Sequence, residues 1–167
     1  GECIALMSNN DIALMAHLMR RAGFGASYED LEVKAVKGYC AAVEELLEPD
    51  DNGVPEFDEL TLSRYFPDMA VPSAPSLGTA NFMYHLYTTP RPLVEKMTLF
   101  WHMLFATGNS KVDNPPEMLQ QIEMFRQYGM GNYKDLLLRL SRDPSMIFWL
   151  DNNQNHKLAP NENWGRE

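Results

Sequence analysis

Helix-start signals recur along this sequence, and they constrain the fold more than any other feature. Asn114 precedes Pro115, Asn132 precedes an apolar segment, and Asp143 precedes Pro144. An Asn or Asp side chain accepts a backbone hydrogen bond at a helix N-terminus, and proline is well tolerated at the first helical position. The sequence therefore predicts a chain of short, capped helices.

Apolar residues recur at helical spacing inside these segments, and no strand pattern competes with them. The fold class we expect is all-α, an irregular multi-helix bundle of about seven helices. Met146 to Leu150 are apolar on every side, so we expect this segment to be central and buried. The main segments with helical spacing are residues 11–22, 27–38, 39–48, 79–87, 90–107, 114–128, 132–140 and 143–152.

Residues 49–78 differ from the rest, because they are acidic and contain five prolines. We expect a long, irregular, Pro-rich loop there, with one short helix near residues 56–66. The whole chain, residues 1–167, has the length of a single helical domain.

The net charge of −9 argues against two classes of partner. An acidic chain without a Lys/Arg stripe repels phosphate backbones, so we expect no nucleic-acid binding. Anionic membrane surfaces are disfavoured for the same reason. No apolar run approaches the roughly 18–20 residues that a membrane span requires, so we expect no transmembrane segment.

The two ends of the chain suggest its origin. It starts at Gly1 rather than Met, as a mature exported protein would after removal of its signal peptide, or as an excised segment would. The last residues begin a helix and leave it only one turn, so we expect the N-terminal part of a longer protein. Cys3 and Cys40 either form a disulfide outside the cytoplasm or are two free thiols, with Cys40 buried in a helix.

His102 is the best single candidate for chemistry. It lies opposite the apolar stripe of its predicted helix, and Glu95 falls on the same side two turns earlier. Two turns are ~10.5 Å of rise, so the two groups meet only through a third, such as a divalent metal. The alternative is that His102 forms a structural hydrogen bond with a neighbouring helix or loop.

The terminal segment is a second candidate, because it is rich in carboxylate and amide groups. Such oxygen-rich segments bind Ca²⁺ or sugars, although this spacing does not match an EF-hand. Asx side chains also cap helices and form turns without any ligand. The candidate ligand residues here are Asp151, Asn155, His156, Glu162 and Glu167.

No catalytic signature points to a reaction. The sequence contains no G-x-S-x-G, H-E-x-x-H, P-loop or dinucleotide-binding pattern. These residues do not decide whether the protein is an enzyme, and they do not identify a cofactor.

Several long motifs occur in a fixed order: HLMRRAGFGAS from His17, RPLVEKMTLFWHMLFATG from Arg91, NPPEML from Asn114, the run from Gly131, and APNENWGRE from Ala159. This set resembles the bacterial domain-of-unknown-function 1800 family. The resemblance implies export and frequent co-occurrence with a second exported family, domain of unknown function 1501. The resemblance does not imply a known reaction. The family pattern W-H-x-H-F has Leu104 here in place of its second His.

Two functional hypotheses follow. The first is a scaffold or interaction subunit of an envelope or extracytoplasmic assembly, periplasmic or extracellular, whose partner is a protein such as the exported 1501-family members. Its surface would be an exposed Met/aromatic patch. The second is a metal-dependent enzyme or ligand-binding domain that uses His102, Glu95 and the terminal acids, completed by residues beyond Glu167.

Overall fold

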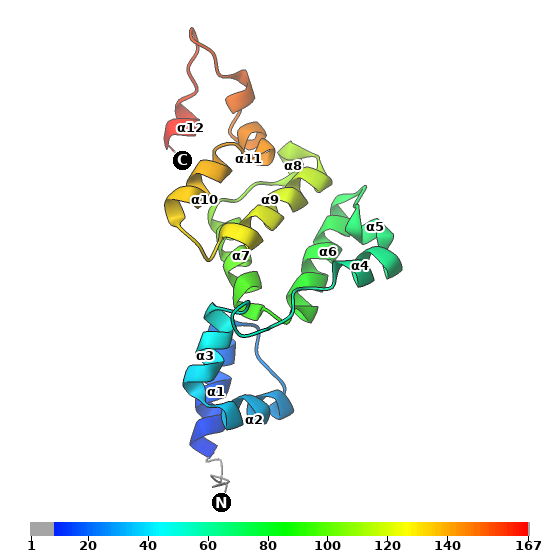
Figure 1. Cartoon of the computed structure of the whole chain (residues 1–167). Coiled ribbons are helices and arrows are strands. Elements are labelled where there is room, and N and C mark those ends of the chain that lie inside the picture. Colours follow the sequence, from blue (N-terminus) through cyan, green and yellow to red (C-terminus); the bar gives the residue numbers. More distant parts are fainter. Residues whose placement is uncertain (1–8, 167) are drawn as a thin grey trace, which may run out of the picture. The chain divides into compact units, whose positions relative to one another are not determined.

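The structure, a computed structural model, describes residues 9–166 and confirms the all-α class (Figure 1). Within those residues there is no strand, and the longer helices match the predicted segments closely. By contacts the residues divide into two compact units, and the chain passes between them more than once. The first unit contains the described residues up to Phe57 together with Thr88–Lys96, and the second contains Asp58–Tyr87 together with Met97 onward.

The first unit is built from three helices and the start of a fourth: α1 (Asn9–Ala22), α2 (Tyr28–Lys37), α3 (Tyr39–Leu47) and the first residues of α7 (Pro92–Leu104). The rest of α7 belongs to the second unit. The other elements of that unit are α4 (Glu59–Tyr65), α5 (Pro67–Ala70), α6 (Pro75–Thr88), α8 (Asn109–Val112), α9 (Pro115–Tyr128), α10 (Tyr133–Leu140), α11 (Pro144–Trp149), a 3₁₀ turn η1 (Asn152–Gln154) and α12 (Glu162–Arg166).

The caps predicted at Asn114, Asn132 and Asp143 are present, and Ser27 caps α2 in the same way. The side chain of Ser27 accepts from the Asp30 amide, that of Asn114 from the Glu117 amide, and that of Asp143 from the Met146 amide. Each bond satisfies an amide that the helix itself leaves without a partner. These local interactions explain why helix starts could be located from the sequence.

Residues 49–78 contain more helix than we expected. Besides α4, which matches the predicted short helix, the stretch holds α5 and the first turn of α6. Pro67 and Pro75 are the first residues of these two helices. Proline at that position loses no helical hydrogen bond, so these prolines start helices rather than interrupt them.

The core of the first unit lies between α1, α2 and α3. Its buried side chains are Met15, Leu18, Met19, Leu31, Ala42 and Leu46, and Leu93 of α7 packs against them. The ammonium of Lys96 donates to the carbonyls of Arg20 (2.8 Å) and Gly23 (2.6 Å) at the end of α1. A cation at these carbonyls complements the helix C-terminus.

The core of the second unit centres on Phe125, whose side chain is 0% exposed. Leu136, Leu140 and Met146 are buried with it. The prediction of an all-round buried segment at residues 146–150 is wrong at Phe148, which is 45% exposed. Because α11 is short and lies at the edge of this core, only one of its sides packs inward.

Gly129 shows how closely the backbone approaches this core. The indole nitrogen of Trp101 donates to its carbonyl at 2.7 Å, and a Cβ on this glycine would lie 2.7 Å from the Trp101 ring. No side chain fits there without moving the ring. The glycine therefore sets the position of Trp101, on which the site described below is built.

Two other predictions from the sequence concern the cysteines and membrane-spanning helices. Cys40 is exposed on α3, which contradicts the expectation of a buried thiol, because the inward positions of α3 are Ala42 and Leu46. Cys3 lies outside the described residues, so the disulfide stays a prediction. None of the helices in residues 9–166 is both long and apolar enough to cross a bilayer.

Candidate functional site: an aromatic groove

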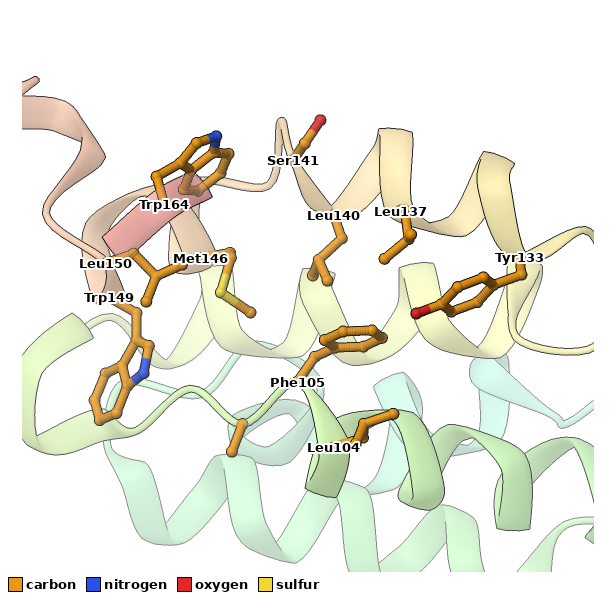
Figure 2. Close-up of a pocket in the computed structure, with 11 residues that line it drawn as sticks. Leu104, Phe105, Tyr133, Leu137, Leu140, Ser141, Met146, Trp149, Leu150 and Trp164 are labelled. Carbon is orange, nitrogen blue, oxygen red and sulfur yellow. The ribbon is translucent and has the colours of Figure 1, made fainter. Parts of the chain in front are cut away.

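The second unit contains an open pocket of about 440 Å³, which we call the aromatic groove. It lies between the end of α7, α10, α11 and α12, and Figure 2 shows Tyr133 at one end and two indole rings at the other. The lining is Leu104, Phe105, Ala106, Tyr133, Leu137, Leu140, Ser141, Met146, Trp149, Leu150 and Trp164. The volume is in the range of sites that bind small molecules or single anchoring side chains.

Stacked rings hold one side of the groove in place. Trp101 stacks on Phe105 with centroids 5.8 Å apart, and on Tyr133 at 5.7 Å. Phe105 in turn stacks on the buried Phe125 at 6.4 Å. Because each ring is packed against the next, the groove is held open by the core beneath it.

A buried polar chain supports the opposite side. The hydroxyl of Thr107 donates to Gln121 (2.7 Å), and the amide nitrogen of Gln121 donates to Asp143 (2.7 Å). The same carboxylate oxygen of Asp143 accepts from the Met146 amide at 2.8 Å. These bonds connect the loop that follows α7 with α9 and the start of α11. They therefore fix α11, which carries Met146 and Trp149 into the groove.

The rim of the groove is apolar and open to solvent. Tyr133 is 53% exposed, Leu104 is 57% exposed, and Phe100 and Met103 of α7 are also exposed. Leu104 lies one helical turn after Phe100, so these two residues share a side of α7. Exposed apolar side chains that adjoin in this way mark an interaction surface more often than isolated ones do.

Sequence reasoning missed the groove residues on α10. Tyr133 and Leu137 line the groove, whereas Leu136 and Leu140 are buried in the core. The sequence did contain a signal for them. Tyr133 and Leu137, four residues apart, form a second apolar stripe beside the core stripe of Leu136 and Leu140. A helix with two apolar stripes has more apolar surface than one core contact covers.

The structure places the two α7 candidates in different units. Glu95 belongs to the first unit, and its side chain is only 2% exposed. His102 belongs to the second, where its ring meets Phe82 edge to face with centroids 5.9 Å apart. Burial lowers the pKa of His102, so its imidazole is neutral at pH 7.

The terminal candidates take part in turns and short contacts. The ammonium of Lys111 pairs with Asp151 at 2.7 Å and donates to the Trp149 carbonyl at 2.7 Å. Asn155 accepts from the Asn161 amide at 2.9 Å. His156 accepts from the Ala159 amide through Nδ1 at 3.1 Å. These are the roles that Asx and His side chains play in loops.

Glu162 pairs with Arg166 within α12 at 3.0 Å, and Glu167 lies outside the described residues. In the part of the chain that the structure covers, no three His, Cys, Asp or Glu side chains are close enough together to hold a metal ion. The metal or ligand role of these residues stays a prediction.

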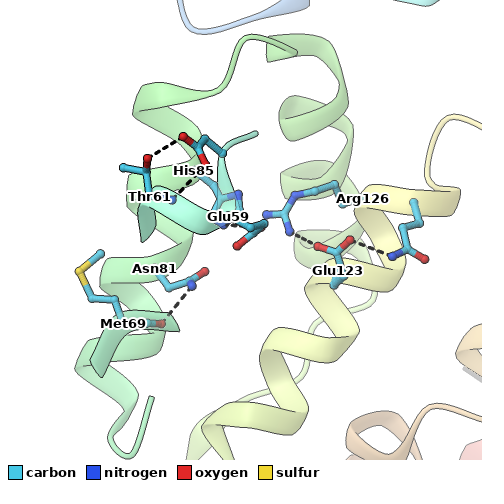
Figure 3. A network of polar contacts seen from close by, with 9 residues as sticks. Glu59, Thr61, Met69, Asn81, His85, Glu123 and Arg126 are labelled. Atoms are coloured by element: carbon cyan, nitrogen blue, oxygen red, sulfur yellow. Dashed lines mark hydrogen bonds and ion pairs between the residues drawn. The ribbon is translucent and has the colours of Figure 1, made fainter. Parts of the chain in front are cut away.

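A separate polar cluster lies where α4, α6 and α9 meet, and Figure 3 shows Glu59, His85, Glu123 and Arg126 gathered there. His85 is 2% exposed, and its Nε2 lies 3.5 Å from Glu59. Burial, aided by the charge of Arg126, lowers the pKa of His85 to about 3. The imidazole is therefore neutral at pH 7, and its contact with the largely exposed Glu59 is not an ion pair at that pH.

This cluster predicts a loss of stability in mild acid. Unfolded His85 takes up a proton below its ordinary pKa of 6.5, whereas the folded residue resists protonation down to about 3. The unfolded state therefore binds more protons, and stability falls as the pH drops below 6.5. Between pH 6.5 and 5 we expect this residue to lower the free energy of unfolding by roughly 2 kcal/mol.

Urea unfolding at several pH values checks this expectation. His85→Leu should flatten the pH dependence, and His17→Gln, at an exposed position on α1, should leave it as in the wild type. Equal pH dependence in the wild type and His85→Leu would contradict the assignment of the effect to this residue.

The fold and the groove together define the class: an all-α protein with a preformed aromatic groove open to solvent. The sequence profile of the family described as "Protein of unknown function (DUF1800)" matches residues 17–167. The chain belongs to this family, as its motifs predicted. Comparisons with curated proteins and with solved structures gave no match.

Proposed function

We propose that this protein is an interaction subunit of an exported bacterial assembly and that the aromatic groove binds a protein partner. The observation that supports this most is the groove itself, whose rings are fixed by stacking while Tyr133 and Leu104 remain half exposed. A preformed apolar surface of this kind binds a partner with little loss of conformational freedom.

The chemistry of the groove selects the part of the partner that enters it. The walls are aromatic and aliphatic, and the lining residues that carry a polar side-chain atom are Tyr133, Ser141, Trp149 and Trp164. Such a site suits one or two large apolar side chains, with Leu or an aromatic residue as the anchor. A charged segment would lose its hydration there without gaining an opposite charge.

Export and the identity of the partner are part of the same proposal. They rest on the family resemblance, which implies a removed signal peptide and co-occurrence with exported proteins of the 1501 family. The partner that we propose is therefore an exported 1501-family protein from the same organism.

Site-specific photo-crosslinking in the intact protein tests the proposal. A photoreactive phenylalanine analogue replaces Leu137 in the groove or, as a control, Leu60, which is exposed on α4 outside the groove. With the purified 1501-family partner, we expect a single adduct from position 137 and none from position 60. Leu137→Lys should weaken binding at least tenfold, because it places a charge in the apolar site.

Equal adducts from both positions, or a Leu137→Lys protein that binds like the wild type, would contradict the use of the groove. Cell fractionation tests export separately. A protein found only in the cytoplasm of its own bacterium would contradict that part of the proposal.

A further inference from the structure

The helix α10 has a second hollow on a side that does not line the aromatic groove. This arginine hollow is open to solvent, has a volume of about 410 Å³ and is lined by Asp135, Leu138, Arg139 and Arg142. The four positions are three or four residues apart, so they form one stripe along α10 and the turn after it. Only Leu136 and Leu140 of the eight residues of α10 are buried, so a single partner can contact both sides of this helix.

The two arginines of the hollow are unpaired within residues 9–166. Arg91, Arg126 and Arg166 each pair with an acidic side chain. The side chains of Arg139 and Arg142, by contrast, form no ion pair or hydrogen bond with these residues, although the chain has 23 acidic residues for 14 lysines and arginines. Two like charges on one side of a helix repel each other, so their presence in one hollow favours an anion from outside.

Arg139 is held in place without the use of its hydrogen-bond donors. Its guanidinium lies 3.5 Å from the centroid of the Tyr128 ring, and Tyr128 packs against the core of the second unit. A guanidinium over an aromatic face keeps its N–H groups available in the plane of the group. The hollow therefore binds an anion with little further loss of side-chain freedom.

The composition of the hollow favours the carboxylates of a short protein segment. A guanidinium matches a carboxylate with two parallel hydrogen bonds. Leu138 is 48% exposed beside the arginines and offers a contact that only a ligand with apolar atoms would use. Two arginines and Asp135 give the lining a net charge of +1, so one or two carboxylates are enough to neutralise it. The net charge of −9 on the whole chain repels long polyanions, whereas a short acidic segment needs only this local attraction.

We infer that the partner segment whose apolar anchor enters the aromatic groove also carries one or two acidic residues, which pair with Arg139 and Arg142 on the other side of α10. This inference rests on the proposed function of the groove. A helix with its side chains is ~10 Å across, so a segment that passes over half its circumference covers ~16 Å. An extended chain advances ~3.3 Å per residue, which places the acids roughly four or five residues from the anchor.

Two peptides test the inference on the full chain. The acidic peptide is acetyl-Leu-Gly-Ser-Gly-Asp-Glu-amide, and the neutral peptide has Asn-Gln in place of Asp-Glu, so the two differ only in charge. The ¹⁵N NMR signals of the Trp149 and Trp164 indoles report the groove, and the side-chain Nε signals of Arg139 and Arg142 report the hollow. We expect the acidic peptide to shift both sets of signals. At low salt it should bind roughly fivefold to tenfold more tightly than the neutral peptide, and this advantage should disappear at high salt.

Three variants locate the acidic contact. Arg139→Gln should weaken the acidic peptide roughly threefold to fivefold and leave the neutral peptide unchanged. Arg64→Gln makes the same exchange at an exposed arginine of α4 outside both hollows and should change neither. Asp135→Asn should act in the opposite direction and strengthen the acidic peptide roughly twofold, because it removes a carboxylate that repels the ligand.

Equal affinity for the two peptides at low salt, or an unchanged affinity for the acidic peptide in Arg139→Gln, would overturn this inference. If both peptides still shift the tryptophan signals, the proposed function of the groove survives that result. Arginine shifts without tryptophan shifts would also overturn the inference, because the hollow would then act apart from the groove. If neither peptide shifts the tryptophan signals up to its solubility limit, the use of the groove and this inference fail together.

Discussion

Replacing Phe125 by Ala is expected to lower the free energy of unfolding of the second unit by about 3–5 kcal/mol. The side chain is 0% exposed and lies at the centre of the core, and its ring stacks on Phe105. Truncation removes this apolar burial and leaves a cavity that a core built from aromatic rings cannot easily close.

Tryptophan fluorescence during urea unfolding measures this effect selectively. All three tryptophans of the chain, Trp101, Trp149 and Trp164, belong to the second unit. The matched control is Phe148→Ala, which deletes a 45% exposed ring on α11 and should change stability by about 1 kcal/mol or less. Similar losses in both variants would show that Phe125 is not the centre of this core.

The second large effect is expected at Asp143, whose side chain connects α9 with α11. Asp143→Ala removes the cap of α11, which is worth about 1 kcal/mol. It also leaves the buried Gln121 amide without its acceptor, at a further cost of about 1–3 kcal/mol. We therefore expect a total loss of about 2–4 kcal/mol.

Asp143→Asn should behave differently, because it keeps an oxygen for both hydrogen bonds and removes only the charge. Burial raises the pKa of Asp143 above 3.8, and the charge of Glu117 adds to this shift. The folded state therefore binds the proton more tightly, and stability falls as the pH rises through the range between the ordinary and the raised pKa. At pH 7 Asp143→Asn should be at least as stable as the wild type, and its advantage should shrink as the pH falls through that range.

Asp135→Ala provides the matched control, because Asp135 is an exposed aspartate in the first turn of α10. It should change stability by less than about 0.5 kcal/mol. A wild-type-like Asp143→Ala protein, or an Asp143→Asn protein as unstable as the alanine variant, would contradict the role of this network.

What could be predicted from the sequence depended on the range of the interactions. The caps at Asn114, Asn132 and Asp143 act within three residues, so the sequence alone revealed them. The same holds for the end of α1 before Gly23. The all-α class followed because such local signals outnumber any strand pattern.

The sites depended on contacts between distant segments and could not be located in this way. His85 and Gln121 are polar residues at helical positions and would ordinarily be assigned to a surface, yet both are buried. Tyr133 and Trp164 line one groove although 31 positions separate them in the sequence. Conversely, the terminal acids attracted attention by composition, and the structure shows them mainly in loop and helix-end contacts.

The path of the chain between the two units has a practical consequence for dissecting the protein. Residues 58–87 are inserted between the two parts of the first unit, and α7 changes units between Lys96 and Met97. A deletion from the C-terminal side therefore cannot remove the second unit without also removing residues 88–96 of the first, whereas a deletion up to residue 57 from the other side leaves the second unit whole. A fragment meant to preserve the first unit would need residues 9–57 joined to 88–96 by an artificial linker, whereas residues 58–167 contain the second unit complete as a single piece.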